Sequence, residues 1–369
     1  MSKYDEEFKP DRSARSVTRR EFLELGLGVG GALLAGTVGQ AAAAAAPAPK
    51  LEGELVFGCN GGGTQRIFEQ QIIPDFAKRY GVKVTYVTGQ PADHVAKLSA
   101  AKGNSGLDAV WLGGATTYVA ADRGLIIEID RSRVPNMQYL DPKLEFEKSV
   151  VPIAYSGNCM IYRSDIYTKR GWAPPTTWFD LWDPKLKGHT GMYSTSSTGG
   201  IEMILQVAKE LSGDYKKLDP AFAKFKELRA NVLDFFPTAG AWETAMQQGD
   251  LWLGVNSFTR AKEMTDAGMP IKFVFPKTGM PLHDLPVGIV KGAPHPNAAY
   301  AWIDYLGSKE VQEKIADKMG YMPASRQAVL SDIVKPFYPD RSLTWMPDWR
   351  YVGTQFETIV NRWSREVER

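Results

Sequence analysis

The sequence contains few of the residues that metal, redox and disulfide chemistry require. Its 369 residues include two cysteines, Cys59 and Cys159, and four histidines, none at metal-ligand spacing from another. Two cysteines are too few for a disulfide framework or for a cysteine-based zinc or iron–sulfur site. They could form one disulfide, but free cysteines are usually buried, which favours two separate buried thiols. We expect no metal and no cofactor.

The chain also lacks a strong charge of either sign. Its 44 Lys and Arg residues nearly balance its 42 Asp and Glu residues, for a net charge of +2, and no long basic run occurs. Binding to nucleic acid or to an anionic membrane surface requires a basic patch. The sequence therefore excludes nucleic acid as an expected partner and favours small molecules or proteins.

Motifs of common catalytic sites are absent as well. The chain contains no G-x-S-x-G elbow, no phosphate-binding loop and no H-E-x-x-H helix. Gly61, Gly62 and Gly63 follow a predicted strand, but Arg66 stands where the third glycine of a dinucleotide fingerprint belongs. The glycines instead predict a loop whose backbone can approach a ligand or simply turn the chain. A binding protein is therefore a simpler hypothesis than an enzyme.

The first fifty residues have the order of an export signal. Arg19 and Arg20 precede a mild apolar run, residues 25–38, and Ala41–Ala46 offer small-residue cleavage sites. The run is shorter than the roughly 20 apolar residues that span a bilayer. The segment resembles a twin-arginine (Tat) signal, although Glu24 stands where that pattern usually has Lys. The resemblance implies export of the folded protein by the Tat machinery and removal of residues 1–46. No cysteine occurs at the cleavage region, so we expect a freely soluble periplasmic protein without a lipid anchor.

The next hundred residues alternate between strand and helix patterns. A strand at residues 54–58 precedes a helix at 65–80, in which Phe68, Ile72, Phe76 and Tyr80 share one face. The pattern then repeats, with strands expected at 82–88 and 107–112 and helices at 92–101 and 116–123. Such alternation predicts an α/β domain with a largely parallel sheet. Ligands of these sheets usually bind beyond the carboxyl ends of the strands, at the loops that begin at Asn60 and Gly113.

A second α/β segment begins near residue 157. Strand-like residues 189–193 lead into the polar run 194–200 and then a helix whose apolar positions from Ile201 follow helical spacing. A further strand, 251–255, ends at Asn256, and residues 273–279 lead through His283 and Asp284 to a strand at 287–290. The segment predicts a second lobe.

Several short motifs, in this order and spacing, resemble extracellular solute-binding proteins of ABC importers. The nearest groups are the spermidine/putrescine type and the iron or phosphonate type. The motifs are Trp178–Pro184 with Lys187–Gly188, Ser196–Gly200, Trp242 with Gly249–Asp250, Phe275–Gly279, Ala298–Leu306 and Gly320–Pro323. The resemblance implies a type II periplasmic binding fold, in which two α/β lobes close on a solute, and a membrane permease as partner of a monomeric binding subunit.

The same resemblance implies where the lobes divide. After the signal, residues 51–155 and 258–320 would form the N-terminal lobe, and residues 156–257 and 321–369 the C-terminal lobe. The chain would cross between them near residues 155–158 and 256–260.

The resemblance also implies a set of ligand-binding positions. They are Asn60, Thr64, Thr116, Ser196, Ser197, Thr198, Asn256 and Asp284. The polyamine branch usually has several carboxylates and aromatic walls, and the iron branch has adjacent tyrosines; this chain matches neither pattern at these positions. The solute is therefore left open among carboxylates, phosphonates, amino-acid-like compounds and polyamines.

The residue types favour a solute with an anionic group. Ser196–Thr198 precede an amphipathic helix, whose free N–H groups and positive dipole end could bind a carboxylate or phosphonate. The alternative is ordinary N-capping of that helix. An amine on the solute could contact Asp284 or Glu243, although either acid could equally be a solvated surface carboxylate.

We therefore expect a periplasmic solute-binding subunit of an ABC importer and not an enzyme. Two alternatives remain. One is a secreted transferase or hydrolase on a similar scaffold, with His283 and Asp284 transferring protons. The other is a structural partner in export that binds no small molecule.

Overall fold

The computed structural model describes residues 49–141 and 147–368. The expected export signal, residues 1–46, lies outside the described residues. Within the described part, no helix has both the length and the apolar character needed to cross a bilayer.

Strands of the described residues join into a single hydrogen-bonded sheet. They are β1 (Glu54–Cys59), β2 (Lys83–Thr88), β3 (Ala109–Trp111), β4 (Val151–Arg163), β5 (Thr190–Tyr193), β6 (Val232–Phe236), β7 (Leu253–Ser257), β8 (Ile271–Val274), β9 (Met280–Ile289), β10 (Met322–Pro323) and β11 (Thr344–Trp345). Their main order is β2-β1-β3-β9-β4-β7-β5-β6, while β8 and β10 pair with β4, and β11 pairs with β9.

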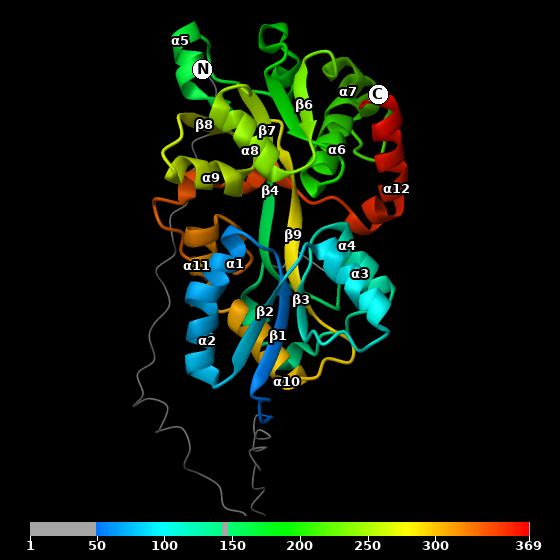
Figure 1. Ribbon diagram of the computed structural model, residues 1–369, viewed down its shortest axis with the longest axis vertical. Coiled ribbons are helices and arrows are strands. Elements are labelled where there is room, and N and C mark those ends of the chain that lie inside the picture. Colours follow the sequence, from blue (N-terminus) through cyan, green and yellow to red (C-terminus); the bar gives the residue numbers. More distant parts are fainter. Residues whose placement is uncertain (1–48, 142–146, 369) are drawn as a thin grey trace, which may run out of the picture. The chain divides into compact units, whose positions relative to one another are not determined.

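The long strand β4 connects two lobes. Its first part, Val151–Gly157, pairs antiparallel with β9, and its second part pairs antiparallel with β7 and β8. Figure 1 shows β4 and β9 running side by side through the middle of the molecule. We call the part around β1, β2 and β3 the first lobe and the part around β5, β6, β7 and β8 the second lobe.

The first lobe is an α/β unit with a core of aromatic rings. Phe57 of β1 and Phe68 pack against Trp302, which is fully buried. The predicted helix at 65–80 is present as a continuous helical segment with a π turn, and Gly81 ends it at φ 68°. The helices of the first lobe are α1 (Gly63–Ile67), η1 (Phe68–Ile72), α2 (Ile73–Tyr80), α3 (Pro91–Ala101), α4 (Ala115–Asp122), η2 (Arg131–Arg133), η3 (Pro135–Tyr139), α10 (Pro296–Leu306), α11 (Lys309–Lys314) and η6 (Ile315–Met319).

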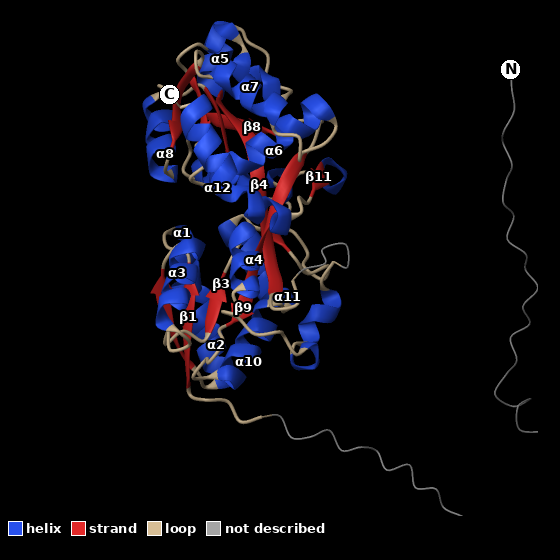
Figure 2. Cartoon of the chain, turned by 90° about the vertical axis from the view of Figure 1, so that its right-hand side faces the viewer, coloured by secondary structure: helices blue, strands red, loops and turns tan. Residues whose placement is uncertain are grey.

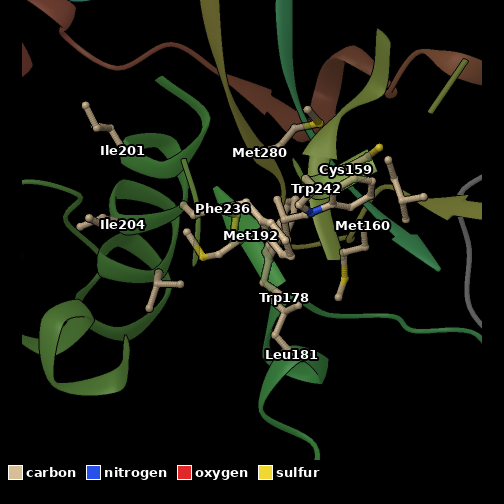
Figure 3. Packing of buried hydrophobic residues seen from close by; sticks show 14 of the residues in the cluster. Cys159, Met160, Trp178, Leu181, Met192, Ile201, Ile204, Phe236, Trp242 and Met280 are labelled. Atoms are coloured by element: carbon tan, nitrogen blue, oxygen red, sulfur yellow. The ribbon is translucent and has the colours of Figure 1, made fainter. Parts of the chain in front are cut away.

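The second lobe has a core in which large side chains fill the space around glycines. Figure 3 shows Trp178, Met192, Phe236 and Trp242 gathered around the strands of this lobe. The indole N–H of Trp178 donates to the carbonyl oxygen of Gly279 at 2.8 Å. The helices of the lobe are α5 (Ser164–Arg170), η4 (Trp178–Trp182), η5 (Pro184–Leu186), α6 (Thr198–Ser212), α7 (Asp219–Leu228), α8 (Ala239–Gln248) and α9 (Phe258–Asp266).

The last helix, α12 (Trp349–Glu366), contacts both lobes. Its fully buried Trp363 packs against Phe225 and Phe235 of the second lobe. At its other end, Arg350 forms ion pairs with Asp122 and Glu147. Figure 2 shows α12 next to the second-lobe helices above α4. The segment before it contains η7 (Lys335–Phe337) and η8 (Arg341–Leu343).

Every helix and strand named in the sequence analysis is present, although the strand expected at 287–290 is the longer β9, which begins at Met280; the second crossing differs. We expected it at residues 256–260, with the chain from 258 onward in the first lobe. Instead, α9 contacts β4, β7 and β8, and β8 pairs with residues 160–163 of β4 in the second lobe. The chain returns through β9, because Leu282–Val287 pair with the first part of β4. The expected crossing rested on the family resemblance, and no local pattern shows which lobe a strand such as β8 joins.

The two cysteines are free and fully buried, one in each lobe. Burial raises the pKa of the Cys59 thiol to about 12 and raises that of Cys159 even further. The favoured interpretation of two separate buried thiols is confirmed.

We expect Gly254→Ala to destabilise the second lobe. A Cβ on Gly254 would lie 2.6 Å from the Trp242 ring and 2.9 Å from the carbonyl oxygen of Gly191. Overpacking of this kind costs about 1–3 kcal/mol, which urea unfolding would measure. The control is Gly240→Ala in α8, where a Cβ has open space and removal of a helical glycine stabilises by about 0.5–1 kcal/mol. Equal stability of both variants would contradict this account of the core.

Candidate ligand-binding site

Six of the eight predicted site residues lie at two places where the lobes meet, and Ser196 and Ser197 belong to neither. The first, which we call the Asp284 group, contains Asp284, the loop at Gly114 and Thr116, and Thr198. The second, which we call the Arg260 group, contains Asn256, Arg260, Glu243 and Glu263, with Asn60, Thr64 and Tyr321 on the first-lobe side.

Asp284 connects β9 to the loop that follows β3. Its Oδ1 accepts a hydrogen bond from the backbone N–H of Gly114 at 3.0 Å. Gly114 has φ 51°, and a Cβ there would lie 3.5 Å from the Thr198 methyl group and from the Trp349 ring. The absence of a side chain at Gly114 therefore allows this first-lobe loop to touch the start of α6. In the same loop, the Thr116 hydroxyl donates to the carbonyl oxygen of Gly113 at 2.8 Å.

The carboxyl group of Asp284 is only partly satisfied. The residue is 1% exposed, and its Oδ2 has no hydrogen-bond partner among the described residues. Burial raises its pKa to about 6, against the opposing effects of the Gly114 N–H and of His283. The interpretation of Asp284 as a solvated surface carboxylate is wrong. A buried acceptor with spare capacity suits the donor of a ligand.

The start of α6 is capped by its own serine. The Ser197 hydroxyl accepts from the N–H of Gly200 at 3.3 Å, and Ser194 and Ser196 share a hydrogen bond of 2.7 Å between their hydroxyl oxygens. Ser196 is exposed, whereas Thr198 lies against the Gly114 loop. N-capping by Ser197 is thus present, and ligand contact by these three residues stays a prediction.

In the Arg260 group, Asn256 and Arg260 lie at the junction of β7 and α9. Asn256 is fully buried; its Oδ1 accepts from the N–H of Ser257, while its Nδ2 lies next to the Tyr193 hydroxyl without a hydrogen bond of normal geometry among the described residues. The Ser257 hydroxyl caps α9 by accepting from the N–H of Arg260. Arg260 then forms ion pairs with Glu243, at 3.4 Å, and with Glu263.

The first-lobe side of this group comes from the loop after β1. A Cβ on Gly63 would lie 3.0 Å from Glu263 Oε1, so α9 lies directly against the start of α1. The Thr64 hydroxyl lies 3.3 Å from that of Tyr321, within hydrogen-bond distance. At the end of β1, Asn60 Oδ1 is buried and has no partner among the described residues.

Strand β4 sets the distance between the two groups. Asp284 pairs with Tyr155, and Asn256 pairs with Cys159, four residues further along β4. At about 3.3 Å per residue, the two positions lie roughly 13 Å apart along the strand. The start of α6 lies between these positions. A Cβ on Gly199 would lie 3.0 Å from Oδ1 of Asn158, on β4 between Tyr155 and Cys159, and 3.1 Å from the Tyr193 ring.

His283 lies on the opposite side of β9 from Asp284. Its Nδ1 is 2.7 Å from Oε1 of the fully buried Glu202 of α6. Burial lowers the pKa of His283, but the Glu202 carboxylate outweighs that effect and the net pKa is raised. Neighbouring residues on a strand point to opposite faces. His283 and Asp284 are therefore poorly placed to transfer protons to one substrate together.

Sequence reasoning assigned no ligand role to Arg260, Glu263 or Tyr321. Tyr321 was noted only within a family motif, and Arg260 only as the end of an expected crossing. The available signal was the position of Arg260, three residues after the serine that ends a buried strand and caps a helix. Within the described residues, no group of three or more His, Cys, Asp or Glu side chains could hold a metal ion.

Comparison with known proteins identifies the family. The family model of bacterial extracellular solute-binding proteins matches residues 71–337. The chain belongs to this family.

Named relatives agree with this assignment. The spermidine/putrescine-binding periplasmic protein of Escherichia coli K12 is 26% identical over 302 residues, which cover 76% of this chain and 82% of that protein. A periplasmic protein of Salmonella typhimurium, named for 2-aminoethylphosphonate binding, is 23% identical, with 79% and 86% covered. The periplasmic binding protein AfuA of Actinobacillus pleuropneumoniae, solved with fructose-6-phosphate, superposes with a TM-score of 0.71 at 23% identity, covering 86% of this chain and 99% of that one. The two-lobed α/β fold expected for such proteins is confirmed.

We expect Asp284→Asn to change how stability depends on pH. A carboxyl group with a raised folded pKa stabilises the folded state below its unfolded pKa, and that contribution is lost as the pH rises through about 6. Asn can still accept from Gly114 but carries no charge. The variant should therefore be more stable than the wild type at pH 7.5, by on the order of 2 kcal/mol, and equally stable near pH 4.

Urea unfolding across this pH range would measure the difference. The control is Asp332→Asn, because the Asp332 side chain is 94% exposed and its charge should matter little. If Asp284→Asn were more stable than the wild type by the same amount at pH 4 as at pH 7.5, the raised pKa of Asp284 would not be the cause.

Proposed function

We propose that this protein is the substrate-binding subunit of an ABC importer and captures a small polar solute between its lobes. The solute carries an anionic group, a carboxylate or phosphonate, together with an amine. The observation that carries the proposal is the set of buried polar atoms at Asn60, Asn256 and Asp284 that have no hydrogen-bond partner within residues 49–141 and 147–368. Each such atom costs about 1–3 kcal/mol when left unpaired. A ligand that satisfies all three would recover that cost and favour closure.

The charged groups around these atoms favour a solute that carries both a positive and a negative charge. Asp284, Glu243 and Glu263 supply carboxylates for an amine, while Arg260 and the start of α6 supply positive charge and N–H donors for an anion. The relatives named above are associated with polyamines, an aminophosphonate and a sugar phosphate, so this family accommodates amines and anions alike. A polyamine remains the second candidate, because acidic groups occur at both ends of the site.

Closure would be a rotation about β4 and β9. We place the lobe boundary in these two strands, near Gly157 and Leu282, which lie opposite each other in the pairing. The contacts of Gly63 with Glu263 and of Gly114 with Thr198 join the lobes and would form on closing. A solute shifts the population toward the closed form only by its extra affinity for that form.

The proposal extends to compartment and partners. The protein would be exported by the Tat machinery, lose residues 1–46, and act as a soluble periplasmic monomer that delivers its solute to a membrane permease. It would bind without turnover. The poor placement of His283 and Asp284 for joint proton transfer supports binding over the alternative of a secreted enzyme.

We expect a saturable rise in Tm with at least one of putrescine, 2-aminoethylphosphonate, 4-aminobutanoate and the common amino acids. Asn256→Ala should weaken binding of that solute roughly 10- to 100-fold, because it removes a buried hydrogen bond to a charged group. Calorimetric titration of both proteins would measure the change, and mass spectrometry would show whether the solute is recovered unchanged.

Asn361→Ala is the matched control, since Asn361 is exposed on α12 and should leave affinity unaltered. Conversion of the solute to a product would support the enzyme alternative. The absence of stabilisation by every compound would overturn the proposal.

We also expect the double substitution Arg19→Lys and Arg20→Lys to leave precursor in the cytoplasm. The Tat machinery reads the arginine pair, and the pair lies outside the mature domain. Cell fractionation with an antibody to the mature domain would measure the distribution, and Arg15→Lys serves as control. Efficient export of the Lys-Lys protein would reject the Tat assignment and leave the binding function standing.

A further inference from the structure

The Arg260 group contains an incompletely satisfied ion pair. Arg260 Nε lies 3.4 Å from Glu243 Oε1, and Arg260 Nη1 contacts Glu263. Both the Arg260 and Glu243 side chains are about one-third exposed, at 35% and 28%. The Arg260–Glu243 distance exceeds that of a good charge-assisted hydrogen bond, which is about 2.7–2.9 Å. Arg260 and Glu243 are therefore close enough to attract each other, but they do not form a good hydrogen bond.

The acceptors of this group have spare capacity. Glu243 Oε1 is buried from solvent and has no hydrogen-bond partner of normal geometry among the described residues. Burial raises the pKa of Glu243, against the effect of Arg260. Asn60 Oδ1, on the loop that brings Gly63 against Glu263, is a second buried acceptor without a partner. Each of these acceptors suits an N–H donor, such as an ammonium group.

The donors of this group have spare capacity too. Among the described residues, neither the buried Asn256 Nδ2 nor Arg260 Nη2 makes a hydrogen bond of normal geometry, and the side chains of both residues lie near the Tyr193 hydroxyl. A guanidinium edge next to an amide N–H suits a carboxylate, which accepts two or more hydrogen bonds. The Arg260 group therefore contains both acceptors and donors with spare capacity.

We propose that the Arg260 group binds the headgroup of an α-amino acid, with the carboxylate on Arg260 and Asn256 and the ammonium on Glu243 and Asn60. This inference rests on the proposed function and names the solute class for the same site. The distance between Arg260 and Glu243 favours an α-amino acid over the other solutes. Arg260 Nε and Glu243 Oε1 are 3.4 Å apart, so the ligand charges that engage these two side chains must lie close together, as in an α-amino acid, where the ammonium and the carboxylate are bonded to the same carbon. The two charges of 4-aminobutanoate or of a diamine are separated by several carbons and cannot engage both side chains at once.

The side chain of the amino acid would then extend along β4 toward the Asp284 group. The roughly 13 Å between the two groups, set by the strand spacing, leaves room for a side chain beyond the headgroup. Asp284, with its free Oδ2, would contact a polar end of that side chain.

Arg260→Gln should change ligand affinity in opposite directions for an amino acid headgroup and for a purely cationic ligand. Arg260→Gln should weaken amino acid binding roughly 10- to 100-fold, because a charged partner of the carboxylate is lost. The same substitution should strengthen the binding of putrescine if an amine alone occupies the group, because it removes a repelling positive charge. Glu243→Gln should weaken binding of the amino acid and leave any binding of its N-acetyl derivative unchanged.

The test uses the mature protein and measures Tm shifts, followed by calorimetric titration. The panel contains the twenty common L-amino acids and L-ornithine, the N-acetyl and carboxamide derivatives of the best binder, 4-aminobutanoate, 2-aminoethylphosphonate and putrescine. Arg362→Gln and Glu366→Gln are the controls, because these residues form another Arg–Glu pair, on α12, and should change affinity less than twofold.

The inference predicts that an L-amino acid gives the largest shift and that loss of either charge, in the ligand or in the protein, reduces it. If putrescine, 4-aminobutanoate or the aminophosphonate binds and no amino acid does, the inference is overturned and the proposed function stands. If no compound binds, both are rejected. If Arg260→Gln does not fold, Glu243→Gln and the two ligand derivatives still decide the question.

Discussion

The antiparallel pairing of β4 with β9 is the interaction on which the rest of the structure depends. One strand of thirteen residues belongs to both lobes, and its register places Asp284 opposite Tyr155. The second part of the same strand places Asn256 opposite Cys159. A slip of one residue would turn every side chain of β9 to the opposite face. The register therefore keeps Asp284 on the loop at Gly114 and His283 on Glu202.

The site combines close backbone approach with incomplete hydrogen bonding. Glycines at 63, 114 and 199 allow side chains from the other lobe or from β4 to come within van der Waals distance of the main chain. Around these contacts, one polar atom each of Asn60, Asn256 and Asp284 is buried without a hydrogen-bond partner in the described part of the chain, although buried polar groups in proteins are nearly always paired. A protein that must bind a polar solute needs such groups, and their cost without the solute supplies part of the preference for the bound, closed form.

The local elements could be predicted, and several candidate site residues could be proposed, because their signals are local. The spacing of Phe68, Ile72 and Phe76 indicated a helix, and the ends of buried strands pointed to Asn60 and Asn256. The second crossing could not be predicted, because only the pairing of β8 and β9 with β4 shows which lobe each belongs to. Arg260 and Glu263 were missed for a related reason. A charged residue on a half-buried helix has no pattern that separates a solvated position from one that faces the opposite lobe.

A crystal structure of the protein with the solute that stabilises it most would test the central claim most directly. The account predicts that the Tyr155–Asp284 pairing is kept, and that the solute lies between the lobes with polar atoms within hydrogen-bond distance of Asn256 Nδ2 and of Asn60 Oδ1 or Asp284 Oδ2. A solute bound elsewhere on the molecule, with these three atoms still unpaired, would contradict it.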